Sequence, residues 1–184
     1  MFTVNFGWNA IMGLQFLHNN LLFLNQGRDT IIRKFHSVFC LHIITILMRK
    51  EHIVIIENLS NYSINYLVVG GWAILFNGFK RLPNDLDIWI ENEKENIEKL
   101  QKSGIISDTV IEDNFYIKIV KNNCKIELIS QMNGLLFKEC FENKGTIIVN
   151  NNNVNYLNIT DIITNKKLLK RKKDMIDLNR ILCQ

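Results

Sequence analysis

The sequence is poor in the residues that break regular structure and in those that build redox or zinc centres. Proline occurs once in 184 residues, as Pro83, so the chain has no proline-rich linker. Its four cysteines are widely scattered, contain no C-x-x-C pair and form no zinc spacing with the four histidines. We therefore expect reduced thiols in a cytoplasmic protein. The motif G-x-x-x-x-G-K-[ST] is absent, which argues against a P-loop.

Acidic residues are nearly absent from the first 47 positions, where Asp29 is the only one, whereas six of the eleven phenylalanines fall there. The apolar stretch 38–48 is shorter than the ~20 residues that a transmembrane helix needs, so we expect no membrane span. Arg49-Lys50 follows it without a cleavage site, which makes a poor signal peptide. Three interpretations of residues 1–47 stay open: a helical segment packed on the domain, a poorly packed extension, or a membrane-surface or targeting segment.

The chain as a whole, with 184 residues of which 47% are hydrophobic, is large and apolar enough for one domain with a core. We expect this domain to span residues 48–184. The net charge of +4 permits a nucleotide or nucleic-acid partner without requiring one.

A glycine pair followed by an aspartate pair is the most informative feature of the sequence. Gly70-Gly71 ends one apolar run of strand type, and Asp85 and Asp87 open the next. Glycine has no Cβ, so the backbone can approach a ligand closely. Residues two apart on a strand face the same side, and two carboxylates ~4 Å apart repel by about 4 kcal/mol at an effective dielectric of ~20. A hard cation such as Mg²⁺ removes that repulsion, so the pattern indicates a metal–nucleotide site.

This pattern resembles the nucleotidyltransferase superfamily, in particular the small stand-alone bacterial enzymes that include toxins of abortive-infection and toxin–antitoxin systems. The resemblance runs from about Met48 to the C-terminus. Pro83 departs from it, because many relatives carry threonine there. The matching residues are Gly70-Gly71-Trp72-Ala73, Arg81 and Asp85-Leu86-Asp87-Ile88.

The resemblance implies a fold, a reaction and a set of partners. The implied enzyme moves a nucleoside monophosphate from an NTP to a hydroxyl and releases pyrophosphate, with Mg²⁺ or Mn²⁺ as cofactor. The acceptor would be an RNA 3′ end, a protein or a small molecule, and a cognate antitoxin protein is a further implied partner. The alternative is a non-catalytic, antitoxin-like module of the same fold that binds nucleotide or protein.

The resemblance also assigns roles to single residues. Asp85, Asp87 and Glu127 become the catalytic metal ligands, and Glu127 would help to activate the acceptor hydroxyl. Its apolar strand neighbours make an unpaired carboxylate costly, although a cross-strand lysine would satisfy it equally. The nucleotide-binding residues would be Gly70, Gly71, Arg81 and Lys166.

For Lys166 the charge pattern leaves a second interpretation open. Lysines and aspartates recur at spacings of three and four after this residue, as on a solvated helix face. Such a face would be joined by the ion pairs Lys170–Asp174 and Lys173–Asp177. Trp72 and Trp89 are expected in the core rather than in the site.

Hydrophobic periodicity predicts an α/β (α+β) fold, in which a mixed β-sheet is flanked by helices and followed by a C-terminal helix. The resemblance implies that this sheet is of nucleotidyltransferase type. Turn signals at 121–123 and 150–153 each predict a hairpin. The predicted helices are 48–62, 71–76, 93–103, 135–141 and one continuous helix from Thr160 to Leu182, and the predicted strands are 66–69, 85–90, 115–120, 125–129, 146–149 and 154–157.

Overall fold

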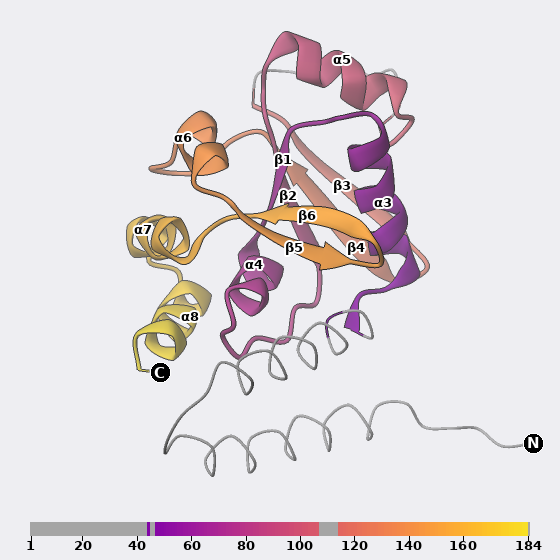
Figure 1. The fold of residues 1–184 in the computed structure, drawn as a ribbon. Helices are drawn as coiled ribbons and strands as arrows, with labels where there is room; N and C mark the ends of the chain where they lie inside the picture. Colours follow the sequence, from indigo (N-terminus) through magenta and orange to yellow (C-terminus); the bar gives the residue numbers. More distant parts are fainter. Residues whose placement is uncertain (1–43, 45–46, 107–113, 184) are drawn as a thin grey trace, which may run out of the picture. The chain divides into compact units, whose positions relative to one another are not determined.

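Six strands form one mixed sheet flanked by helices in the computed structural model, which describes residues 44, 47–106 and 114–183 (Figure 1). The predicted α+β fold with a mixed sheet is thus confirmed. The three interpretations of residues 1–47 lie largely outside the described residues. The strands are β1 (Tyr66–Val69), β2 (Leu86–Ile90), β3 (Tyr116–Lys121), β4 (Cys124–Ile129), β5 (Gly145–Val149) and β6 (Asn152–Tyr156). The helices are α3 (Lys50–Asn61), α4 (Gly70–Phe76), α5 (Lys94–Lys102), α6 (Phe137–Glu142), α7 (Ile159–Leu169) and α8 (Lys172–Leu182).

The strand order is β3-β4-β2-β1-β6-β5, so β1 and β2 are central. These two strands are antiparallel, while β2 pairs with β4 and β1 with β6 in parallel. Antiparallel hairpins β3–β4 and β5–β6 complete the sheet on either side. The order brings β4 directly beside β2, although α5 and β3 separate them in the sequence.

Asparagine pairs make both hairpin turns. Asn122 and Asn123 have φ of 49° and 59°, and Asn150 and Asn151 have φ of 52° and 65°. Two successive left-handed residues define the type I′ turn, whose twist suits a two-residue hairpin loop. Asparagine tolerates this conformation better than most residues do. Both predicted hairpins are confirmed.

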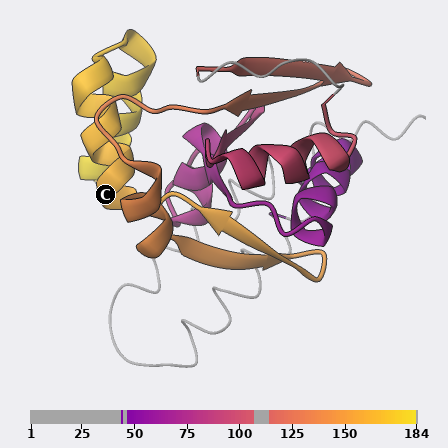
Figure 2. The same ribbon diagram turned by 90° about the horizontal axis from the view of Figure 1, so that it is seen from above.

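The two faces of the sheet carry separate hydrophobic cores, because successive strand residues point to opposite sides. Tyr66, Val68 and Ile88 pack with buried side chains of α3 and α5 on one face. Leu67, Val69 and Trp89 pack on the other, with side chains of α6, α7 and α8. Figure 2 shows α7 and α8 on one side of the sheet and α3 on the other. Trp72 and Trp89, each only 2% exposed, are core residues as predicted.

The single long C-terminal helix that we predicted is wrong. Asn158, rather than Thr160, caps α7, and Lys170 ends this helix with a left-handed φ of 52°. Arg171 then caps α8, and its backbone N–H and guanidinium donate hydrogen bonds to the Asp174 carboxylate. The break lets α8 fold back against α7, so that Asp174 and Asp177 both form ion pairs with Lys166. These contacts replace the ion pairs Lys170–Asp174 and Lys173–Asp177 expected for a solvated helix face.

The core extends to the N-terminal side of Met48. Ile44 is 2% exposed and Met48 4%, and both belong to the cluster that includes Ile56 and Leu59 of α3. Leu47 packs against the same cluster. Some side chains before the predicted boundary at 47/48 therefore contribute to the core. None of the helices in the described part of the chain is long and apolar enough to span a membrane.

Candidate metal centre

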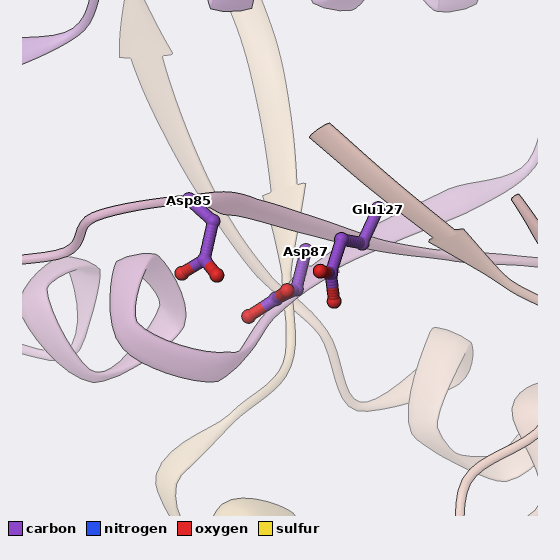
Figure 3. A group of neighbouring side chains, drawn as sticks. All are labelled: Asp85, Asp87 and Glu127. Carbon is purple, nitrogen blue, oxygen red and sulfur yellow. The ribbon is translucent and has the colours of Figure 1, made fainter. Parts of the chain in front are cut away.

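Three carboxylates meet on one face of the sheet. Asp85 comes directly before β2, Asp87 is its second residue, and Glu127 lies opposite Asp87 on the parallel neighbour β4. Paired residues of adjacent strands face the same side, so the strand order places Glu127 beside the aspartates. One oxygen from each carboxylate lies within 4.8 Å of the others, and all three residues are half-buried. Figure 3 shows the Asp87 carboxylate between those of Asp85 and Glu127.

Gly70 packs directly against this group. Val69 is paired with Asp87 across β1 and β2, so the next residue passes over the aspartate side chain. A Cβ on Gly70 would collide with the Asp87 carboxylate, and the φ of +63° already disfavours other residues. Gly71 lies against Pro83, whose Cβ would be 3.4 Å from an added Cβ. The glycine pair thus leaves room for the Asp87 carboxylate and for the chain that leads to it.

Asp87 carries the strongest electrostatic signal of the site. Burial and, after it, the neighbouring carboxylates of Asp85 and Glu127 raise its pKa to about 7. The positive charges of Lys173 and Lys166 oppose this rise in pKa only in part. The metal-free cluster therefore holds more negative charge than its surroundings neutralise, which is the condition that a bound cation relieves.

Tyr116 is a member of this neighbourhood that our sequence analysis missed. It is the first residue of β3 and the diagonal neighbour of Glu127 in the β3–β4 register. Interaction with the Glu127 carboxylate, followed by partial desolvation and the charges of Asp87 and Asp85, raises the pKa of the Tyr116 phenol. Lys118, the lysine directly opposite Glu127 in the β3–β4 register, lies on the same face. Tyr116, Lys118 and Val120 alternate along β3 and are exposed. This strand pairs with β4, which carries Glu127, so the alternation was the available signal.

The two cations predicted to bind nucleotide are held by one carboxylate, Asp177 of α8. Lys166 Nζ lies 2.9 Å from Asp177 Oδ2 and 3.1 Å from Asp174 Oδ1. Arg81 Nε lies 3.2 Å from Asp177 Oδ1. Both aspartates are buried. Burial alone would raise the pKa of Asp174, but hydrogen bonds from Arg171 and Lys166 outweigh it and leave this pKa lowered.

The junction of α7 and α8 supplies positive charge beside the acidic cluster. Lys173 and Lys166 both lower the pKa of Asp87, and Asp87 in turn raises the pKa of Arg171. Lys173 and Arg171 are exposed, whereas Lys166 is buried. The site thus combines three metal-type ligands with cations that remain accessible to an anionic substrate.

No family model matches this chain, and no curated protein matches it.

Proposed function

We propose that the protein is a divalent-metal-dependent nucleotidyltransferase that moves a nucleoside monophosphate from an NTP to a hydroxyl group. The observation that supports this best is the meeting of Asp85, Asp87 and Glu127 on one sheet face, with Gly70 against them. Carboxylate oxygens are the ligands that Mg²⁺ and Mn²⁺ prefer, and the donor set contains no thiol or imidazole. Mg²⁺, bound by these three residues, would neutralise the charge of a triphosphate and stabilise the entering and leaving oxygens.

The chain's own residues divide the remaining work. Asp85 and Asp87 would hold the cation, whose charge would favour binding of the substrate phosphates beside them. Gly70, which has no side chain, lets the backbone pass directly beside the Asp87 carboxylate, so that a phosphate bound at the cluster would lie near this backbone. Exposed Lys173 and Arg171 add charge at the same end of the sheet, where phosphates would enter.

Glu127 is suited to receive the proton of the acceptor hydroxyl. It lies opposite Asp87 in the β2–β4 register, and its carboxylate is part of the acidic cluster. A general base must lie within hydrogen-bond reach of the proton that it takes. Lys166 and Arg81 form ion pairs with Asp177, so they could bind phosphates only while they also contact this carboxylate. Lys173 is therefore better placed to bind a phosphate.

The test is a transfer assay with the full-length protein. Each of the four NTPs, labelled at the α-phosphate, is incubated with Mg²⁺ and with total RNA or total protein as acceptor. We expect transfer of label from at least one NTP, its loss in EDTA, and a loss of about 10²–10³-fold in Asp87→Asn. Glu98→Gln, an exposed change on α5, is the control and should transfer normally. Undiminished transfer by Asp87→Asn would remove the catalytic assignment.

A further inference from the structure

The sheet face that carries Glu127 continues beyond the metal centre onto β3, where its side chains are exposed. Lys118 is opposite Glu127 in the β3–β4 register, and Lys125 lies two residues before Glu127 on β4, so all three side chains point to the same side. Both lysines are exposed, and Val120, the partner of Lys125, is 61% exposed. The metal centre therefore borders an open surface on its β3 side.

The opposite face of the same two strands is closed. Ile126 and Leu128 of β4 are at most 1% exposed, and Ile117 and Ile119 of β3 pack against the same hydrophobic core. The two strands are thus anchored by one face, and their other face is a surface of regular, paired β-structure. A ligand can bind there without a rearrangement of the core.

Lys118 and Lys125 supply positive charge to this surface. None of the ion pairs in the described part of the chain involves either lysine, although Lys118 lies opposite Glu127. As diagonal neighbours in the register, two such residues are about 7–8 Å apart, close to two nucleotide steps of ~3.4 Å each along a stacked strand. The surface therefore complements a chain of phosphates.

An exposed aromatic ring lies at one end of the same row. Tyr116 precedes Lys118 by two residues on β3, so it is on the same side of the sheet, and it is 59% exposed. Positive charge that follows a phosphate backbone and aromatic rings on which bases stack are the usual elements of single-strand binding. An acidic peptide would pair with the lysines but has no bases to stack on the ring, so the combination favours a nucleic acid.

The position of this surface relative to the cluster suits an acceptor. The Asp87 carboxylate lies between those of Asp85 and Glu127 (Figure 3), and Glu127 is the member on β4, the neighbour of β3. The open surface therefore adjoins the carboxylate to which we assign the acceptor proton. The NTP phosphates, in contrast, are assigned to the cation and to the exposed charges of α8.

We propose that this surface, formed by Tyr116, Lys118, Val120 and Lys125, binds the single-stranded 3′ end of an RNA, the acceptor of the transfer. The inference rests on the proposed function and names its acceptor. Unpaired RNA ends are common targets of protein recognition. In the transfer, the 3′ oxygen forms a bond to the α-phosphorus of the NTP, and the bond from this phosphorus to the oxygen bridging to the β-phosphorus breaks. Pyrophosphate leaves with that oxygen, and the proton of the hydroxyl passes to Glu127.

The first experiment measures binding of a 5′-fluorescein-labelled, unstructured RNA of about 12 nucleotides by fluorescence anisotropy, with full-length protein and Mg²⁺ at several salt concentrations. Lys118→Gln/Lys125→Gln is the test variant. Lys94→Gln/Lys102→Gln is the matched control, because it removes two exposed lysines of α5, which packs on the opposite face of the sheet. The slope of log affinity against log salt should become shallower by about 1.4 in the test variant only, ~0.7 for each lost phosphate contact. At ~0.1 M salt, this slope corresponds to an affinity about 25-fold weaker.

The aromatic ring is tested with the same RNA. Tyr116→Leu removes the ring but keeps an apolar side chain, and it should weaken binding about fivefold or more, the lower limit for the loss of one stacked base. Tyr62→Leu is the control, since Tyr62 is 43% exposed at the end of α3 on the opposite face, and it should bind normally. Equal affinities of the two tyrosine variants would overturn the binding of bases at this surface.

Comparison ligands and Mn²⁺ separate the remaining outcomes. Equal RNA affinity and salt slope in the two lysine variants would overturn the inference, and so would tighter binding of single-stranded DNA of the same sequence. An acidic peptide that binds as tightly as the RNA and is lost in the test variant would make this a protein-binding surface instead. Mn²⁺ binding with a non-hydrolysable NTP should be unchanged in the test variant. If the wild type lacks this Mn²⁺ binding, the proposed function has failed, and RNA held by the lysines is not its acceptor.

Discussion

At the scale of single residues, Asp87 determines how the site behaves. It lies opposite Glu127 in the β2–β4 register, and its carboxylate packs against Gly70. Burial and like charge raise its pKa to about 7. The protonation of Asp87, the stability of the fold and the affinity for any cation held by the cluster should therefore depend on one another.

The raised pKa of Asp87 gives a pH dependence of known sign. A carboxyl with a pKa of 3.8 when unfolded and about 7 when folded favours the folded state while it is protonated. This contribution is complete below pH 3.8 and is lost as the pH rises to about 7; the 3-unit difference corresponds to about 4 kcal/mol. In EDTA, we expect the wild type to lose stability between pH 5 and pH 8 and Asp87→Asn to lose less.

Urea titrations of the two proteins and of Glu98→Gln at both pH values measure this difference. At pH 8 the free energy of unfolding of Asp87→Asn should exceed that of the wild type by ~1 kcal/mol or more. Adding Mg²⁺ should raise the free energy of unfolding of the wild type but not that of Asp87→Asn. Parallel pH profiles for wild type and Asp87→Asn would show that Asp87 is not the titrating group.

Gly70 is the second residue whose identity is dictated by the site. Gly70→Ala should cost about 1–2 kcal/mol for its left-handed backbone and, in addition, displace the Asp87 carboxylate. Gly104→Ala is the matched control, since Gly104 has a φ of +69° and an added Cβ would meet nothing within 4 Å. Both variants should lose similar stability, because both place alanine in a left-handed backbone conformation. Only Gly70→Ala should bind Mn²⁺ more weakly, as measured by electron paramagnetic resonance. Equal Mn²⁺ affinity in the two variants would contradict the contact.

Several residues of the site could be predicted from the sequence, because a glycine pair and two aspartates on adjacent strands are local patterns. The pairing of Glu127 with Asp87 was not, since it depends on which strand becomes the neighbour of β2. Tyr116 was missed for the same reason, because only the β3–β4 register makes it the diagonal neighbour of Glu127.

At the scale of elements, the break between α7 and α8 is the feature that periodicity did not predict. Neither glycine nor proline marks it, and Lys170 adopts the left-handed conformation itself. In one continuous helix Lys166 and Asp174 would be about 12 Å apart along the axis. Contact with Lys166 therefore requires the break, and this contact is a tertiary interaction rather than a local one.

Lys166 should accordingly be a stability residue. Lys166→Met would leave the buried carboxylates of Asp174 and Asp177 short of a partner and cost about 3–5 kcal/mol. Lys167→Met, a change at the exposed neighbour, should cost little. Because the pKa of Asp174 is lowered, the stabilisation is present at neutral pH and is lost on acidification. Thermal melts at pH 7 that show equal midpoints for the two variants would contradict this role.

At the scale of the whole molecule, the question is how many residues before Met48 the domain needs in order to fold stably. Every residue assigned a role follows Met48, so we expect a chain that begins at Met48 to fold. Such a chain lacks Ile44, whose loss from the core should lower its stability by about 2–5 kcal/mol relative to the full chain.

Thermal melts of the full chain, of a chain starting at Met48 and of one starting at Leu41 test this expectation. The chain from Leu41 keeps Ile44 and should melt at a higher temperature than the one from Met48. If the chain from Met48 has no cooperative transition, the domain boundary at 47/48 is wrong.

The central claim, that the acidic triad binds a divalent metal together with an NTP, is tested most directly by Mn²⁺ binding. Electron paramagnetic resonance of Mn²⁺ titrated into the full-length protein with a non-hydrolysable NTP measures it without knowledge of the acceptor. We predict tight binding that the NTP analogue strengthens, retained in Glu98→Gln and weakened at least about tenfold in Asp87→Asn and Glu127→Gln. Equal Mn²⁺ affinity in wild type and Asp87→Asn would contradict the account.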